Sequence, residues 1–383
     1  MKIAILRGGN LNKWDMMTFE NIKRSHDITA IGAKNPRYDL STIKLRKKLL
    51  LRFGSLTEWT GYPAILMDYV LNMNNWLFGL KRSLKDMDIV EASDITYPFT
   101  YQAVKYHPLV VCNCFENIPF FREWGATGKY KSYARTHAAH FIAVTQKAKS
   151  VLELEGVPAE KITIIPPGID IDNFRPKKKD ISMLKKYGIK KGDVTILFTG
   201  RLIYDKGIED LIYAFKLLCD KHDNIRLLIL GKGKLKKNIS KTLERYGIVD
   251  KVIFMGFLPY GQTEKFYNLA DIFCTPSRIT KYWQEQFGFV FAEAMACGKP
   301  VVSTHTGSIP EVLSGTGILV SPGNHLELFE ALERLVKNPE LRKELGAKAR
   351  SYAMKNYDAK AIAKKRTELY ERLYKEYKQY KRD

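Results

Sequence analysis

Short apolar segments alternate with longer stretches of helical spacing along most of the chain. The strand-like segments of the first half are residues 2–6, 88–92, 109–112, 140–144 and 162–165. Those of the second half are residues 194–199, 226–230, 252–255, 272–275 and 300–304. Short apolar strands separated by helices are typical of parallel sheets that are covered on both faces. The pattern therefore predicts an α/β protein with two doubly wound domains.

A linker separates the two halves of this pattern, and a final helix follows the second half. Pro166-Pro167-Gly168 and the basic residues 175–180 interrupt it between the two halves. After residue 356 a charged helix carries apolar residues at intervals of three and four, namely Ile362, Leu369, Tyr370, Leu373, Tyr374 and Tyr377. We predict an N-terminal domain over residues 1–172, a second domain over residues 173–356, and a helix over residues 357–383 that returns to the N-terminal domain.

Composition supports two folded domains. The 383 residues are 45% hydrophobic and 12% aromatic, which excludes a disordered chain, and no apolar run approaches the roughly 18 residues of a membrane span. The apolar start, residues 1–6, is too short for the core of a signal peptide. We expect a cytoplasmic protein, either soluble or peripheral on the inner face of the membrane.

Neither disulfides nor metals are expected. Five cysteines in a chain of this length form no disulfide framework, and Cys112 and Cys114 are spaced too closely for a redox or zinc pair. Asp86-Met87-Asp88 and Asp170-Ile171-Asp172 have the Asp-x-Asp spacing of a known metal-binding motif. We assign the first to a helix cap and the second to the linker.

The net charge of +22 indicates an anionic partner but does not name it. Residues 44–53 and 76–82 mix lysine and arginine with leucine, phenylalanine and tryptophan. Such segments bind anionic membrane surfaces, which would suit a membrane-proximal or lipid-linked partner. The alternative is a core helix with a solvated basic face. A nucleic-acid partner is disfavoured, because basic residues do not interleave with aromatic ones as in the known modules.

A candidate phosphate site lies in residues 200–207, where a strand ends and a helix begins. Ligands of open α/β sheets bind at the carboxyl ends of strands, and a helix N-terminus attracts phosphate. Arg201 and Lys206 add fixed positive charge at this point. The alternative is that both are solvated surface cations.

Two carboxylates in residues 285–300 form the second candidate. Residues 289–295 are predicted to be helical, and Gly298-Lys299-Pro300 ends the helix. Helical rise separates two residues eight positions apart by about 12 Å, so we expect Glu285 and Glu293 to face one cleft from two levels. Carboxylates accept paired hydrogen bonds from vicinal hydroxyls, as a ribose or hexose site requires. Two unrelated glutamates on a helix flank are the alternative.

The run from Glu285 to Glu293, followed by Ala294-Met295-Ala296-Cys297-Gly298-Lys299-Pro300, resembles the signature of family-four retaining glycosyltransferases of the GT-B fold. Further matching motifs are Pro166-Pro167-Gly168-Ile169-Asp170, Gly200-Arg201, Lys206-Gly207, Gly231-Lys232-Gly233, Gly256, Pro276-Ser277 and Gly307-Ser308-Ile309-Pro310-Glu311. The resemblance is specific over residues 160–325 and thin before them. It implies two Rossmann-like domains that face each other across a cleft.

The resemblance also implies roles. Arg201 and Lys206 would hold the donor diphosphate, Glu285 would contact the donor sugar, and Glu293 would bind the ribose hydroxyls. The remaining donor-binding positions would be Gly8, Gly9, Gly200, Gly231, Leu258, Phe287, Gly288 and Phe289. The family retains the anomeric configuration and needs no metal or other cofactor, since the nucleoside-diphosphate sugar is itself the donor substrate.

One departure from the family concerns the N-terminal half. The family often carries a histidine after a central strand, where this chain has Glu116 and Asn117. We expect Glu116 to take the sugar-contacting or base role. The alternative is that Glu116 only caps the following segment.

The expected function is the transfer of a hexosyl group from a nucleotide sugar to an acceptor, such as a lipid-linked or polysaccharide glycan. A nucleotide-sugar epimerase or a phosphorylase of the same fold is the alternative, because a fold does not fix a reaction. A basic nucleic-acid-binding protein is the weaker alternative.

Overall fold

The computed structural model describes residues 1–54, 72–258 and 260–382. The chain forms two compact units. The first comprises Met1–Gly168 together with Ala359–Asp383, and the second comprises Ile169–Asp358. The boundaries that we predicted after residues 172 and 356 both fall inside the second unit.

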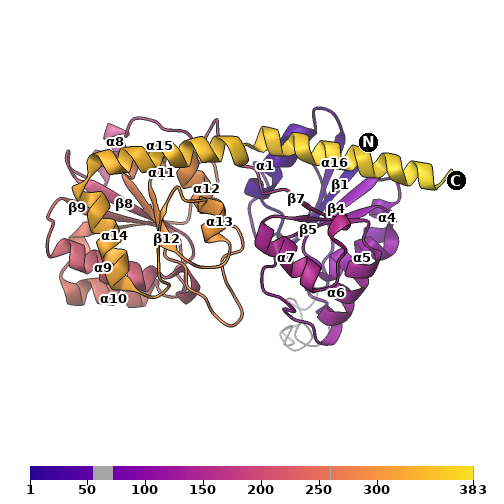
Figure 1. The fold of residues 1–383 in the computed structure, drawn as a ribbon, viewed down its shortest axis with the longest axis horizontal. Coiled ribbons are helices and arrows are strands. Elements are labelled where there is room, and N and C mark those ends of the chain that lie inside the picture. The colour runs from indigo at the N-terminus through magenta and orange to yellow at the C-terminus, as the bar shows by residue number, and fades with distance from the viewer. Residues whose placement is uncertain (55–71, 259, 383) are drawn as a thin grey trace. The chain divides into compact units, whose positions relative to one another are not determined.

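The first unit is built on a sheet of seven parallel strands in the order β3-β2-β1-β4-β5-β6-β7. The strands are β1 (Lys2–Gly8), β2 (Asp27–Ala33), β3 (Arg46–Leu50), β4 (Ile89–Ala92), β5 (Val110–Cys114), β6 (His140–Ala143) and β7 (Ile162–Ile164). Its described helices are α1 (Lys13–Ile22), α4 (Leu80–Leu84), α5 (Pro98–Tyr106), α6 (Gly125–His137), α7 (Gln146–Leu154) and α16 (Ala359–Tyr380), with a short 3₁₀ turn at Ala159–Lys161. Helices cover both faces of the sheet (Figure 1).

The second unit repeats this plan with six parallel strands in the order β10-β9-β8-β11-β12-β13. The strands are β8 (Val194–Thr199), β9 (Ile225–Leu230), β10 (Val252–Gly256), β11 (Ile272–Cys274), β12 (Val301–Thr304) and β13 (Ile318–Val320). The helices are α8 (Ile181–Lys186), α9 (Ile208–Cys219), α10 (Lys236–Tyr246), α11 (Glu264–Leu269), α12 (Phe289–Ala296), α13 (Ile309–Leu313), α14 (His325–Lys337) and α15 (Pro339–Asn356), with 3₁₀ turns η2 (Tyr204–Lys206) and η3 (Val249–Lys251).

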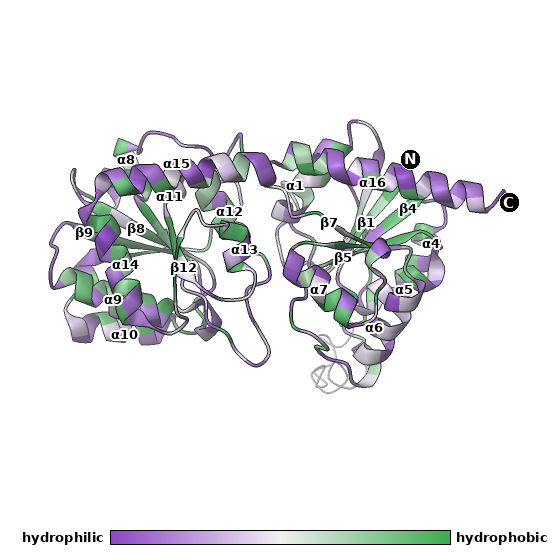
Figure 2. Ribbon diagram, viewed as in Figure 1, coloured by the Kyte–Doolittle hydropathy of each residue, from purple (hydrophilic) through white to green (hydrophobic). Residues whose placement is uncertain are grey.

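Burial of the central strands on both faces explains why they are apolar throughout. Ile3, Ala4, Ile5 and Leu6 of β1 are all inaccessible to solvent, and so are the core residues of β8 and β9. The central strands of both units are accordingly mostly green in Figure 2, whereas many outward positions of the helices are purple. The predicted class, two doubly wound α/β domains, is confirmed.

Strand β3 corrects the interpretation of residues 44–53. This segment is neither an amphipathic helix nor a core helix but the edge strand of the first sheet, and Arg46, Lys47, Lys48 and Leu49 are exposed. Lysines on an edge strand discourage pairing with another chain. The charge of this segment therefore has a local structural explanation.

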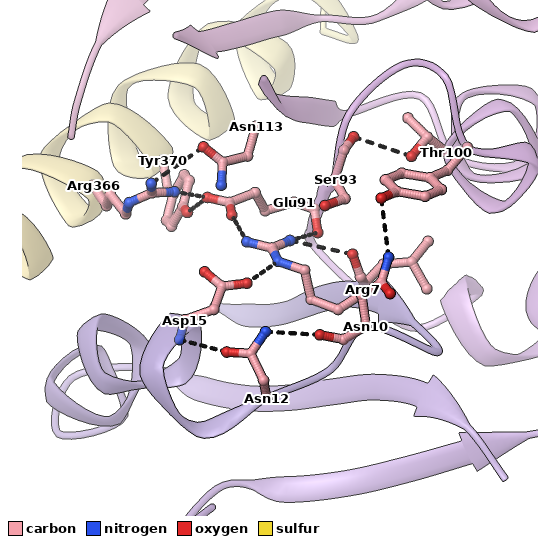
Figure 3. Close-up of polar contacts among 12 residues, drawn as sticks. Arg7, Asn10, Asn12, Asp15, Glu91, Ser93, Thr100, Asn113, Arg366 and Tyr370 are labelled. Carbon is pink, nitrogen blue, oxygen red and sulfur yellow. Dashed lines mark hydrogen bonds and ion pairs between the residues drawn. The ribbon is translucent and has the colours of Figure 1, made fainter. Parts of the chain in front are cut away.

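The C-terminal helix α16 packs on the first unit, as predicted, and a buried cluster of charges fixes it there (Figure 3). Glu91 of β4 is fully buried and accepts hydrogen bonds from Arg366 and Tyr370 of α16. Its other carboxylate oxygen lies 2.5 Å from the Arg7 guanidinium, which also pairs with Asp15 at 2.5 Å. Burial raises the pKa of Glu91, but Arg366 and Arg7 outweigh it and hold that pKa below its usual range.

Candidate functional site

The strand order of the second sheet reverses between β8 and β11. Successive strands β8, β9 and β10 run outward on one side, and β11, β12 and β13 run outward on the other. Loops that leave the carboxyl ends of the two central strands diverge at such a point and open a crevice for ligands. Arg201 and Lys206 follow β8, whereas Ser277 and Glu285 follow β11. The folded chain thus places both predicted motifs at the reversal point.

An ion pair joins the two loops. The Lys206 ammonium lies 2.5 Å from Oε2 of Glu285, and Ser277 Oγ donates to the same oxygen at 3.1 Å. The side chains of Lys206 and Glu285 are only 14% and 8% exposed. The Lys206 ammonium also lies 4.5 Å from the centre of the Trp283 ring. Lys206 is therefore a partly desolvated cation whose present anionic partner is a carboxylate.

Arg201 differs from Lys206. Its side chain is exposed and forms no ion pair with any residue of the described ranges. It stands at the end of β8 with its charge uncompensated. Arg201 and Lys206 thus lie in the same loop in different environments. Of the two, only Lys206 forms an ion pair with a described residue.

The position of Glu285 corrects the predicted geometry. Helix α12 begins at Phe289, so Glu285 and Glu293 do not share a helix and the helical rise does not apply to their separation. Gly288 separates them with a φ of +75°, in the left-handed region that favours glycine. A Cβ at Gly288 would also lie 2.4 Å from the Phe291 ring. The turn at Gly288 therefore separates the loop that carries Glu285 from helix α12.

Glu293 does lie on α12, but in a more polar setting than its apolar neighbours in sequence suggest. The Tyr267 hydroxyl donates a hydrogen bond of 2.6 Å to its Oε2. Both side chains are buried, and burial raises the pKa of Glu293 to about 8, although the Tyr267 hydrogen bond opposes the rise. The carboxyl is therefore largely protonated at neutral pH.

The predicted glycines bring backbone segments close together. A Cβ at Gly231 would lie 1.8 Å from the carbonyl oxygen of Gly200, so the close approach of the loops after β8 and β9 requires a glycine at residue 231. Phe287 is buried in edge-to-face contact with Phe289 and with Tyr357. Leu258 is half-buried in the loop after β10. These positions shape the edge of the second sheet, and their contact with a donor stays a prediction.

The first sheet also reverses, between β1 and β4. Gly8 ends β1 and Gly9 follows it, and Gly8 has a φ of +54° with a Cβ position only 2.6 Å from the Phe99 ring. Local packing thus requires a glycine here irrespective of any ligand. The predicted role of both glycines at a diphosphate stays a prediction.

Two carboxyl groups lie at this edge of the first sheet. Asp94 follows β4 and accepts hydrogen bonds from the backbone of Phe115 and Glu116. Burial and the nearby Glu116 raise the pKa of Asp94 to about 7. Asp94 was not predicted as a site residue, because its hydrogen-bond partners follow a different strand.

One oxygen of Glu116 accepts hydrogen bonds from the N–H groups of Asn117 at 3.0 Å and Ile118 at 2.9 Å, as a capping residue does. Burial raises the pKa of Glu116.

Two family models match successive parts of the chain. "Glycosyltransferase Family 4" matches residues 23–173, and "Glycosyl transferases group 1" matches residues 180–352. The chain belongs to the family-four, group 1 glycosyltransferases. The motifs of residues 160–325 that suggested this membership fall largely in the second of the two matches.

Curated relatives of the family share part of their length with the chain. An uncharacterized glycosyltransferase of Methanocaldococcus jannaschii, MJ1607, is 30% identical over 60% of this chain and 59% of its own length. A D-inositol 3-phosphate glycosyltransferase of Corynebacterium jeikeium is 31% identical over 60% of this chain and 56% of its own length. The chain thus matches less than two thirds of either relative.

Solved structures share the fold over nearly all of the chain. Anabaena Alr3699/HepE in complex with UDP has a TM-score of 0.77 at 19% identity and covers 96% of this chain and 99% of its own. Sucrose-phosphate synthase of Thermosynechococcus elongatus has a TM-score of 0.76 at 19% identity, with 98% and 99% covered. These similarities confirm the GT-B fold.

The residues that the structure describes form no cluster of potential metal ligands. No group of three or more histidine, cysteine, aspartate or glutamate side chains among the described residues could hold a metal ion. The five cysteines are free thiols, four of them buried. Among the described helices, none is both long and apolar enough to cross a membrane.

Proposed function

We propose that this protein transfers a hexosyl group from a nucleoside-diphosphate sugar to an acceptor, with retention of the anomeric configuration and without a metal. The observation that carries the proposal is the cluster of Lys206, Glu285 and Ser277 at the reversal point of the second sheet. A half-buried cation and a carboxylate, 2.5 Å apart at the carboxyl ends of parallel strands, offer one group for a diphosphate and one for sugar hydroxyls.

The charges suit a leaving diphosphate. Negative charge develops on the phosphate oxygen as the glycosidic bond breaks, and preorganised positive charge stabilises it. Arg201, which is exposed and unpaired within the described ranges, and Lys206 would supply that charge. An arriving diphosphate competes with Glu285 for the Lys206 ammonium. The released carboxylate can then accept hydrogen bonds from the sugar.

Glu293 would serve at the ribose in its protonated form. A neutral carboxyl both donates and accepts hydrogen bonds, so it can pair with a vicinal diol while it keeps the Tyr267 contact. Glu116, with Asp94 beside it, is proposed for the acceptor side or for contact with the transferred sugar.

The relatives support a nucleotide sugar as donor without naming it for this chain. One relative is called a GDP-mannose-dependent mannosyltransferase, and the HepE structures contain UDP or UDP-glucose. D-inositol 3-phosphate and phosphatidylinositol monomannoside occur in the names of relatives. We therefore propose a phosphorylated, glycan or lipid-linked acceptor in glycan biosynthesis.

A thermal-shift panel tests the proposal. UDP-, GDP- and ADP-sugars are each added to the purified chain, since a ligand that binds the native state raises the melting temperature. At least one should stabilise it, and nucleoside diphosphate should be released only when an acceptor is present. Release of free sugar phosphate would favour a phosphorylase, and conversion of the donor without release would favour an epimerase. Stabilisation by nucleic acid alone would contradict the proposal.

We also propose that the first unit binds an anionic membrane surface. The two basic segments noted in the sequence lie side by side, since Phe78 N–H donates to Leu51 C=O at 3.0 Å and Arg52 pairs with Leu77. Leu49, Leu51 and Phe78 are 37%, 38% and 42% exposed there. Exposed apolar side chains with flanking cations suit an interface with anionic lipid.

Flotation with vesicles tests the membrane proposal. The chain should float with vesicles that contain phosphatidylglycerol and not with pure phosphatidylcholine. Leu51→Ser with Phe78→Ser should abolish flotation, whereas Ile164→Ser, at a residue of the same unit that is also 38% exposed, should leave it unchanged. Equal loss in both variants, or no flotation of the wild type, would contradict the proposal.

A further inference from the structure

A short turn carries Trp283 from β11 towards Glu285. Thr280 and Trp283 pair across this turn in an antiparallel bridge, with Thr280 N–H donating to Trp283 C=O at 2.9 Å. Ile279 and Tyr282 are 54% and 67% exposed, whereas Trp283 is half-buried. The turn thus points one aromatic side chain inward and leaves its other large side chains in solvent.

An arginine at the start of the turn connects the turn to the loop after β8, which carries Lys206. Arg278 pairs with the buried Asp210 through two nitrogens, and its Nε lies 2.6 Å from Asp210 Oδ2. The Arg278 guanidinium also lies 4.5 Å from the centre of the Tyr204 ring, and its backbone N–H donates to Asp205 C=O at 2.8 Å. Tyr204 and Asp205 belong to η2, as does Lys206. These contacts therefore fix the position of the turn relative to Lys206.

The consequence is a contact that the sequence did not reveal. The Lys206 ammonium lies 4.5 Å from the centre of the Trp283 ring while it pairs with Glu285 at 2.5 Å. Of these two partners, the carboxylate is an anion that a phosphate can displace. The indole ring is neutral, and its attraction to a cation persists when the anion is exchanged.

We propose that Trp283 is a positioning residue that holds the Lys206 ammonium in place while the diphosphate of the donor replaces Glu285 as its anionic partner. Lysine carries a flexible stem that must be ordered in any single arrangement. A ring fixed by the Arg278 anchor restricts that freedom before the donor arrives. This inference rests on the proposed function, because it names a further residue for the same donor site.

The test compares Trp283→Leu with Trp283→Phe, and Tyr282→Leu serves as the control for the same turn. Equilibrium binding is measured for the nucleoside diphosphate that the wild type selects from UDP, GDP and ADP, and for the corresponding free nucleoside. Trp283→Leu should weaken diphosphate binding about tenfold and leave nucleoside binding unchanged. Trp283→Phe, which keeps an aromatic face, and Tyr282→Leu should each stay within about threefold of the wild type.

Separate outcomes distinguish the inference from the function on which it rests. If the wild type binds no nucleoside diphosphate, the proposed function itself fails. If the wild type binds one and Trp283→Leu binds it equally well, only the role of Trp283 is overturned. Equal losses for nucleoside and diphosphate would also overturn it, since they indicate a general loss of structure. Should Trp283→Leu not fold, Trp283→Met takes its place with the same expected result.

Discussion

The hydroxyl of Tyr267 donates a hydrogen bond of 2.6 Å to the carboxyl group of Glu293. Tyr267 belongs to α11 and Glu293 to α12, and both side chains lie in the interior of the second unit. Glu293 is mostly neutral at pH 7, because burial raises its pKa to about 8.

Glu293 should make the stability of the second unit fall as the pH rises. Its pKa is about 8 in the folded chain and 4.5 for an unperturbed glutamate, so the folded state binds more protons between these values. The contribution of Glu293 to the free energy of unfolding is therefore fully present below its unperturbed pKa. This contribution is lost as the pH rises towards the pKa of the folded chain, with a slope of at most about 1.4 kcal/mol per pH unit.

Urea unfolding of the wild type and Glu293→Gln measures this effect. Glutamine keeps an acceptor for Tyr267 but does not ionise. The free energy of unfolding of the wild type should fall relative to that of Glu293→Gln between about pH 5 and about pH 8. A difference between the two proteins that does not change with pH would contradict the assignment.

Glu116→Gln separates catalysis from capping. Glutamine retains an oxygen that can accept the N–H groups of Asn117 and Ile118, so the melting temperature should stay near that of the wild type. The loss of the carboxylate should lower kcat by about 100-fold or more if Glu116 acts on a proton or on developing charge. Unchanged turnover in a normally folded variant would leave Glu116 with the capping role alone.

The buried cluster around Glu91 should contribute far more to stability than the surface pairs of the same helix. Arg366→Ala removes one partner of a fully buried carboxylate and should lower the free energy of unfolding by about 3–5 kcal/mol. Arg372→Ala, whose pair with Glu376 is more than half exposed, should change it by less than about 0.5 kcal/mol. Similar losses in urea titrations of the two variants would refute this difference.

Gly207 and Gly188 allow backbone strain to be separated from crowding. Both lie in the left-handed region, with φ values of +63° and +64°. A Cβ at Gly207 would lie 1.8 Å from the Pro276 carbonyl oxygen, whereas a Cβ at Gly188 would meet nothing within 4 Å. Gly188→Ala should cost about 1 kcal/mol, and Gly207→Ala at least about 3 kcal/mol. Equal shifts in the urea midpoint would show that crowding at Gly207 is relieved cheaply.

The apolar segments were sufficient to predict the fold class, because parallel strands buried on both faces are apolar throughout. They did not predict three strands, namely the buried strand β2 and the edge strands β3 and β13. The edge strand β3 is largely exposed and basic, so its composition gives no sign of a strand. Strand β13 has only three residues, of which only Val320 is buried. An edge strand has one neighbour and little core to fill, so hydrophobic pattern alone is a weak signal there.

Parts of the candidate site could likewise be found in the sequence. The motifs that contain Lys206 and Glu285 could be recognised in the sequence. The ion pair between these two residues could not, because only the pairing of β8 with β11 brings them together. The contacts of Tyr267 with Glu293 and of Asp94 with the backbone after β5 depend on tertiary structure in the same way. Gly288 could have been recognised as a break before the helix, which would have corrected the placement of Glu285.

The most direct test of a donor site at Lys206 is the turnover of Lys206→Ala with the selected nucleotide sugar, compared with Lys241→Ala, an exposed lysine on α10 of the same unit. Both variants lose one positive charge. Lys206→Ala should lower kcat/KM by about 100-fold or more, because a cation that stabilises the leaving diphosphate is removed, and Lys241→Ala should match the wild type. Equal turnover in all three proteins would contradict the account.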